Sequence, residues 1–195
     1  MMYNRLVTFG CSLTYGQALN DRHKESWPAQ LGQLMNLPVA NHGVPGASTK
    51  HIWWNAINFE FDPNDCLVFL WTHIDRWCMI KTHEIDPLNH WETDHNEKSK
   101  IWYKHFHDDF DMSTMYFALV NHANFYLQSK VKKIYNLVAT ENDQQMPTFN
   151  QINFLPQMIS EIRGKYPKAS DDWHPGPKAM KEYAKQIYTE IQKGT

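Results

Sequence analysis

The chain has 195 residues, of which 42% are hydrophobic and 21% are charged, and its formal net charge is −2. This length is typical of one domain with a substantial core, and the composition excludes a largely disordered chain. The small charge gives no electrostatic basis for binding nucleic acid or an anionic membrane, and no apolar run approaches the ~20 residues that span a bilayer. We therefore expect one globular domain over residues 1–195, with neither nucleic acid nor membrane as a partner.

Two features of the sequence predict a cytoplasmic protein. Residues 1–5 lead directly into an apolar run and leave no room for a signal peptide. Cys11, Cys66 and Cys78 are odd in number and lack the spacing of metal ligands. Free thiols in a reducing compartment are the interpretation that fits this cysteine usage.

The first apolar run ends near a serine. Residues 6–9 predict a short buried strand, because β-branched and aromatic residues suit a pleated core position. Gly10 permits a sharp turn, which leaves Ser12 at the carboxyl end of the strand. Ligands and catalytic groups collect at that edge of an open α/β sheet. Ser12 is therefore either a nucleophile or the cap of a following helix.

Predicted strands and helices alternate along the rest of the chain. The apolar run at 66–71 is almost continuous, which is typical of a central strand buried on both faces of a sheet. Serine caps and helical spacing predict helices after Ser26, Ser48 and Ser113, and the most regular apolar stripe lies near the C-terminus. This alternation predicts a parallel sheet with helices on both faces. The expected strands are 6–9, 37–40, 66–71 and 134–139, with 166–169 as a candidate fifth strand.

Residues 79–112 show no periodicity of either kind. A loop of this length in a compact domain is usually functional, so we expect an insertion that acts as a lid. Its aromatic side chains, Trp91 and Trp102 among them, would shape a substrate pocket. A metal site is the alternative, but the stretch lacks a recognised ligand spacing, so we predict no metal. The histidines are His83, His90, His95, His105 and His107, and the metal hypothesis would use the last two with Asp108 and Asp109.

A second candidate for catalysis stands near the C-terminus. Asp171 and His174 are three residues apart and precede a proline-rich turn. One turn of chain can bring the carboxylate to one imidazole nitrogen and leave the other nitrogen free. This pair would supply the base and the orienting carboxylate of a Ser-His-Asp triad. The alternative is a surface turn with an unrelated aspartate and histidine.

Several stretches of the chain resemble the sequence blocks of the SGNH (GDSL-type) hydrolases. Gly10-Cys11-Ser12-Leu13 is similar to the first block, with Cys11 where aspartate is usual. Residues 26–31 resemble the helix that follows it, residues 41–48 the second block, and 171–174 the last. The third block, normally Gly-x-Asn-Asp, is poorly matched by residues 71–76, which lack the asparagine.

The resemblance implies a three-layer α/β/α, flavodoxin-like fold with a parallel sheet of four to five strands and no cofactor. It implies hydrolysis of a carboxylic ester, with a short acyl or acetyl group, on a small molecule or a carbohydrate. Ser12 would be the nucleophile, His174 the general base and Asp171 the carboxylate that orients the imidazole.

The resemblance also implies an oxyanion hole that this chain matches only in part. Backbone N–H groups of Ser12 and Gly46 would hold the oxyanion, and Thr72 or His73 could replace the missing asparagine donor. Losing one donor typically costs ~3 kcal/mol of transition-state stabilisation. The missing asparagine favours a non-catalytic ligand-binding module on the same fold as one alternative. An acyltransferase with the same triad is the other alternative.

Overall fold

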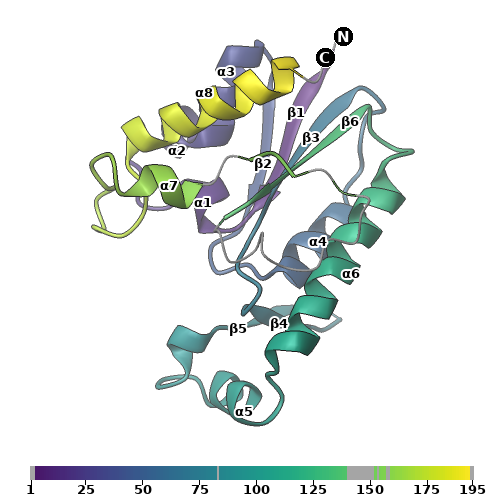
Figure 1. Cartoon of the computed structure of the whole chain (residues 1–195), viewed down its shortest axis with the longest axis vertical. Helices are drawn as coiled ribbons and strands as arrows, with labels where there is room; N and C mark the ends of the chain where they lie inside the picture. The colour runs from purple at the N-terminus through teal and green to yellow at the C-terminus, as the bar shows by residue number, and fades with distance from the viewer. Residues whose placement is uncertain (1–2, 83, 140–151, 153, 157–158, 194–195) are drawn as a thin grey trace.

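The computed structural model describes residues 3–82, 84–139, 152, 154–156 and 159–193. Its central sheet has the strand order β2-β1-β3-β6, and all neighbouring strands are parallel (Figure 1). The four predicted strands are confirmed, with β2 shifted towards its carboxyl end. These strands are β1 (Arg5–Gly10), β2 (Val39–Gly43), β3 (Asp65–Trp71) and β6 (Lys133–Val138).

Helices cover both faces of the sheet and make the three-layer α/β/α fold expected from the sequence (Figure 1). Successive side chains of a strand point to opposite faces, so Val68 and Leu70 join one core cluster and Phe69 and Trp71 join the other. Every residue of β3 is buried, as its continuous apolar run predicted. The helices on the first face are α3 (Trp27–Met35), α7 (Ile159–Arg163) and α8 (Pro177–Lys193), and those on the second are α4 (Thr49–Ile57) and α6 (Asp109–Leu127).

Helix α6 begins at Asp109, four residues before the predicted cap at Ser113. The carboxylate of Asp108 accepts the backbone N–H groups of Phe110 and Asp111, both at 3.0 Å. These bonds satisfy amide groups that have no partner within the helix, and acidic side chains in the first turn favour its positive end. Asp109 and Asp111 therefore belong to the helix and Asp108 caps it, although the sequence analysis places all three in the insertion.

The candidate fifth strand at 166–169 does not form. Lys168 instead makes an isolated antiparallel bridge with Pro175, so the two ends of the loop between them lie together. Within the described residues the sheet has four strands, the lower number expected from the sequence.

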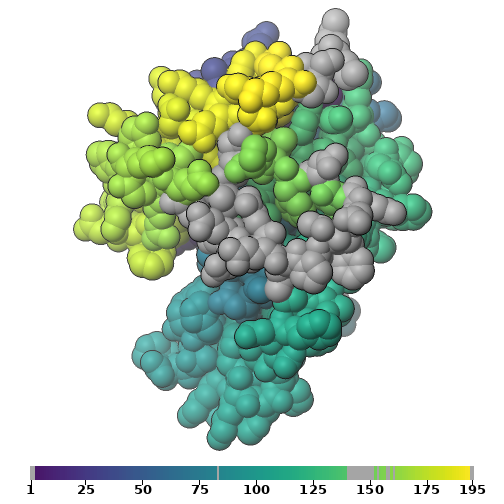
Figure 2. Space-filling view, viewed as in Figure 1, coloured from purple at the N-terminus to yellow at the C-terminus, as the bar shows by residue number. Residues whose placement is uncertain are grey.

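The stretch 79–112 contains regular structure that its sequence did not predict. Strands β4 (Trp77–Ile80) and β5 (Ile85–Leu88) form an antiparallel hairpin, followed by a 3₁₀ turn, η1 (His90–Glu92), and helix α5 (Glu97–His105). Strands of four residues and a helix whose only buried residue is Ser99 leave no detectable period. These elements lie beyond the carboxyl ends of the sheet strands and form the lower end of the molecule (Figures 1 and 2). His83 lies outside the described residues.

Candidate active site

Ser12 begins a short helix, α1 (Ser12–Tyr15), immediately after β1. The turn between them is tight, because a Cβ on Gly10 would lie 2.0 Å from the hydroxyl oxygen of Thr14. Only glycine fits there without a shift of its neighbours. The Ser12 side chain thus lies at the carboxyl edge of the sheet, where residue 12 is 9% exposed.

Asp171 and His174 are hydrogen-bonded to each other. Nδ1 of His174 lies 2.5 Å from Oδ2 of Asp171, and the backbone N–H of His174 donates to Oδ1 at 2.9 Å. The N–H of Trp173 donates to the same oxygen at 3.0 Å. Since Nδ1 is engaged, Nε2 is the nitrogen left for a substrate or a nucleophile.

Three hydrogen bonds also control the charge of Asp171. Partial burial acts to raise the pKa of Asp171. The hydrogen bonds from the backbone and ring of His174 and from the backbone of Trp173 outweigh burial and lower this pKa to about 2. The carboxylate is therefore ionised at neutral pH and accepts a hydrogen bond from a protonated Nδ1.

The loop that carries His174 is tied to the chain that follows α1. The hydroxyl of Ser170 donates to the carbonyl of Ala18 at 2.9 Å, and the Ser170 N–H donates to the same oxygen at 3.3 Å. Within the loop, the N–H of Ala169 donates to the carbonyl of His174 at 2.8 Å. These bonds join the two ends of the sequence at the edge where Ser12 lies.

Ser12 and His174 line one cavity of about 720 Å³. Gly46 and His73 line the same cavity, so residues from four separate segments meet there. Gly46 has a φ of +72°, a backbone conformation that favours glycine. The structure thus brings together most of the site residues predicted from the sequence.

The two candidates for the third oxyanion donor differ in position. Thr72 is fully buried and is not part of the cavity wall, whereas His73 is. Burial is the main cause that lowers the pKa of His73, to about 4, and the nearby charge of Arg76 adds to the effect. The His73 ring is therefore neutral at pH 7.

Of the two tryptophans predicted for the pocket, only Trp91 lines the cavity. Trp91 lines the cavity and is 46% exposed, with the guanidinium of Arg76 4.6 Å from its ring centre. Trp102 instead stacks on Trp77, with ring centres 5.6 Å apart, and on Phe106 at 5.8 Å. Trp102 is on helix α5, and its ring packs on the β4 hairpin rather than on the cavity wall.

Several residues of the cavity wall were missed by the sequence analysis. Asn89 follows β5, Arg163 ends α7, and Trp173 lies in the loop before α8. The Arg163 guanidinium lies 4.2 Å from the Trp173 ring centre. Trp173 lies within the 171–174 block, whereas Asn89 and Arg163 come from segments that carry no recognisable motif. Their positions depend on tertiary contacts, so single-sequence patterns held no signal for them.

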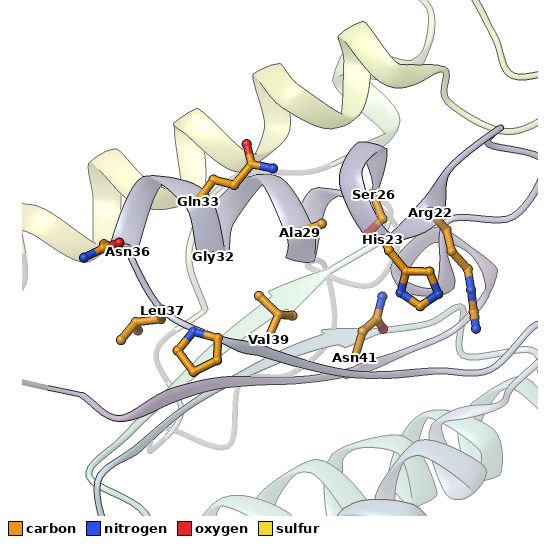
Figure 3. A pocket seen from close by; sticks show the side chains of 11 residues that line it. Arg22, His23, Ser26, Ala29, Gly32, Gln33, Asn36, Leu37, Val39 and Asn41 are labelled. Carbon is orange, nitrogen blue, oxygen red and sulfur yellow. The ribbon is translucent and has the colours of Figure 1, made fainter.

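A second cavity of about 660 Å³ lies between α3 and β2 and opens beside the short helix α2 (Arg22–Glu25) (Figure 3). Gly32 of α3, Val39 and Asn41 of β2, and Arg22 of α2 are among the residues that line it. None of the site residues predicted from the sequence lines this cavity.

The described part of the chain contains no group of three or more His, Cys, Asp or Glu side chains placed to hold a metal ion. None of its helices is long and apolar enough to cross a membrane.

Solved structures with the same fold include esterases and lipolytic proteins. A member of the lipolytic G-D-S-L family from Veillonella parvula matches with a TM-score of 0.58 and 13% identity, over 97% of this chain and 98% of that chain. The acetylxylan esterase Axe2 from Geobacillus stearothermophilus matches with a TM-score of 0.57 and 16% identity, over 96% and 94%. The esterase EstA from Pseudoalteromonas matches with a TM-score of 0.57 and 12% identity, over 97% of each chain.

No protein-family model and no curated protein matches this sequence. The structural likeness extends over nearly the whole chain, and the chain therefore has the SGNH-hydrolase fold.

Proposed function

We propose that the protein is a serine hydrolase that cleaves carboxylic esters of short acyl or acetyl groups through a Ser12-His174-Asp171 triad. The observation that carries this proposal is that His174, hydrogen-bonded to Asp171 through Nδ1, lines the same cavity as Ser12. Catalytic mutants of Axe2, which shares the fold, replace a serine in one case and a histidine in another. Serine and histidine chemistry on this fold is consistent with the proposal.

In the proposed reaction, the Ser12 hydroxyl oxygen attacks the acyl carbonyl carbon while Nε2 of His174 takes the hydroxyl proton. Asp171 accepts the Nδ1–H hydrogen bond, which fixes the imidazole tautomer and stabilises the imidazolium. The tetrahedral intermediate then expels the alcohol, which takes its proton from Nε2. Water, activated by the same nitrogen, releases the acyl group from Ser12 and restores the enzyme.

The backbone N–H groups of Ser12 and Gly46 are the proposed donors to the oxyanion. The part of residues 79–112 that precedes α6 is proposed to act as an insertion that walls one side of the cavity, with Trp91 in contact with the substrate. An exposed tryptophan beside polar side chains suits a sugar ring as well as an acyl group. We therefore propose a small-molecule or carbohydrate ester as the substrate, as in the acetylxylan esterase neighbour.

The cysteines support a cytoplasmic setting for this activity. Cys11, Cys66 and Cys78 are free and buried. Burial raises the pKa of the Cys66 thiol to about 12, so it remains an unreactive thiol. Because free cysteines are typical of proteins in reducing compartments, we propose that the protein works in the cytoplasm.

Labelling with a fluorophosphonate, together with turnover of p-nitrophenyl acetate, tests the proposal. Wild-type protein should take up one label on Ser12, and Ser12→Ala should lose both label and turnover. Ser129→Ala, at an exposed position after α6, is the matched control and should retain both. A label elsewhere, or turnover by Ser12→Ala, would contradict the triad. If the folded protein neither takes up the label nor turns over the ester, a binding module is favoured. If the acyl group is transferred to an added alcohol faster than to water, an acyltransferase is favoured.

A further inference from the structure

The insertion brings a side-chain amide into the wall of the active-site cavity. Asn89 follows β5 and is 1% exposed, yet it lines the same cavity as Ser12 and His174. Its Nδ2 lies 3.6 Å from the point that a Cβ on Gly46 would occupy. A hydrogen-bond donor thus lies directly beside the glycine whose backbone N–H we assign to the oxyanion hole.

The chemistry of its neighbour fixes which way the Asn89 amide points. Nδ2 donates to Oε1 of Glu92 at 3.2 Å, and an ionised carboxylate can only accept. The nitrogen therefore faces the Glu92 and Gly46 side of the group. An amide nitrogen carries two hydrogens, so the bond to Glu92 leaves one hydrogen for a second acceptor.

The carbonyl oxygen of the same side chain is buried and has no hydrogen-bond partner within the described residues. An unpaired buried polar atom lowers stability, and this oxygen is one of several such atoms in the described residues. The unpaired oxygen is consistent with an amide that is held for its nitrogen rather than for its own hydrogen bonds.

The backbone around Asn89 is anchored on two sides. Its N–H donates to the hydroxyl of Ser99, which is fully buried on α5, at 3.3 Å. The hydroxyl of Tyr103 lies within hydrogen-bonding reach of the carbonyls of Leu88, at 3.1 Å, and of Asp75. These contacts tie the residue before Asn89 to the loop that follows β3. A donor held in this way needs little reorganisation when charge develops beside it.

We propose that the Nδ2–H of Asn89 is the third donor to the oxyanion formed when Ser12 attacks its ester. This inference rests on the proposed esterase function. It explains how the site works without an asparagine at the end of β3, because the donor arrives from the insertion. The insertion would then complete the catalytic machinery as well as wall the cavity.

The test compares Asn89→Ala and Asn89→Asp with Asn64→Ala, an exposed asparagine at the amino end of β3. Asn89→Ala should lower kcat by about 10²–10³-fold with little change in KM, because the contact strengthens only in the transition state. Asn89→Asp keeps the size of the side chain but places a negative charge beside the oxyanion, so it should lose at least as much. Asn64→Ala should behave as wild type.

Binding of a boronic acid separates a catalytic role from a structural one. A boronate on Ser12 mimics the tetrahedral intermediate, so its affinity should fall in Asn89→Ala by about the same factor as kcat/KM. Thermal melting should show a folded protein. If Asn89→Ala fails to fold, the pair Glu92→Ala and Glu92→Gln replaces it. Only the glutamine keeps an oxygen to accept from Nδ2, so kcat should fall in the alanine variant and be largely retained in the glutamine variant.

Failure of this inference can be told apart from failure of the proposed function. Wild-type protein that neither labels on Ser12 nor turns over an ester would refute the esterase itself. Wild-type activity with an unchanged kcat in Asn89→Ala would refute the role of Asn89 alone, as would activity retained by Asn89→Asp. In that case His73→Ala is the next variant to measure, since His73 lines the same cavity.

Discussion

Asp171 holds His174 through two different carboxylate oxygens. Oδ1 accepts the backbone N–H of His174 at 2.9 Å, and Oδ2 lies 2.5 Å from Nδ1 of its ring. One oxygen therefore fixes the loop and the other fixes the imidazole. Because both contacts lie within four residues of chain, the orientation of the ring depends little on distant elements. Substitution of Asp171 therefore tests directly whether the orientation of the His174 ring is needed for activity.

Asp171→Asn should reduce kcat by roughly 10⁴-fold while the protein stays folded, as loss of the orienting carboxylate does in Ser-His-Asp triads. An amide that donates to Nδ1 would hold the tautomer that cannot accept the Ser12 proton at Nε2. The matched control is Asp172→Asn. Asp172 has a φ of +55°, which asparagine tolerates, so this variant should keep its activity. The reverse ranking of the two variants would assign the orienting role to Asp172.

The stability of the protein should depend on pH through His73. Burial lowers the pKa of His73 in the folded state to about 4, against ~6.5 in an unfolded chain. Between these values the unfolded state binds more protons. The stability due to the neutral ring is therefore complete above pH ~6.5 and is lost as the pH falls towards 4, by at most ~1.4 kcal/mol per pH unit. Urea unfolding at a series of pH values gives the free energy of unfolding of wild type and of His73→Gln. Between pH 4 and 6.5 this free energy should depend less steeply on pH in the variant. Above pH 7 the two curves of free energy against pH should be parallel. Equal pH dependence at pH 4–6.5 would contradict the assignment.

The sheet and the triad candidates were predictable because each depends on a short stretch of sequence. Strand β3 is buried on both faces, so it is an unbroken apolar run. Ser12 follows a strand and a glycine that no larger residue can replace without a shift. Asp171 and His174 are close enough in sequence for one turn to join them. These short stretches made the three residues candidates, and the resemblance to the SGNH hydrolases supplied their expected roles.

Asn89 and Trp102 could not be placed from the sequence, for a different reason. The position of Asn89 beside Gly46 depends on a hairpin of four-residue strands and on contacts with Ser99 and Tyr103. Trp102 lies on a helix without an apolar stripe, so its partner could not be inferred. Short elements that gain order from tertiary contacts leave no periodic signal. The start of α6 was misplaced for another reason, because Asp108 caps the helix five residues before the serine that the sequence analysis takes as the cap.

Chelation should leave the esterase activity and the melting temperature of the protein unchanged. The proposed reaction stabilises the oxyanion with N–H donors and needs no Lewis acid. Dialysis against EDTA, followed by assays of kcat and Tm, should give wild-type values, and added zinc should not raise the activity. Metal analysis of the purified protein is the control. A stoichiometric metal that is lost together with activity would contradict the prediction and would make the histidines of 90–107 the first ligands to test.

Trp91→Ala should affect substrate binding, whereas Trp102→Ala should affect stability. Trp91 lines the cavity and is half exposed, so its loss should raise KM or change the preference among acyl and sugar esters, with little change in Tm. Trp102 stacks on Trp77 and Phe106, and aromatic pairs contribute about 0.5–1.5 kcal/mol each beyond their burial. Its loss should therefore lower the free energy of unfolding by at least about 1–3 kcal/mol, since the lost burial of the ring adds to the two pairs, and should leave KM near the wild-type value. Urea unfolding and steady-state kinetics on a panel of esters measure both effects in the same samples.

A raised KM in Trp102→Ala at unchanged stability would mean that the α5 helix reaches the substrate. A wild-type KM in Trp91→Ala for every ester would show that Trp91 is not part of the binding surface.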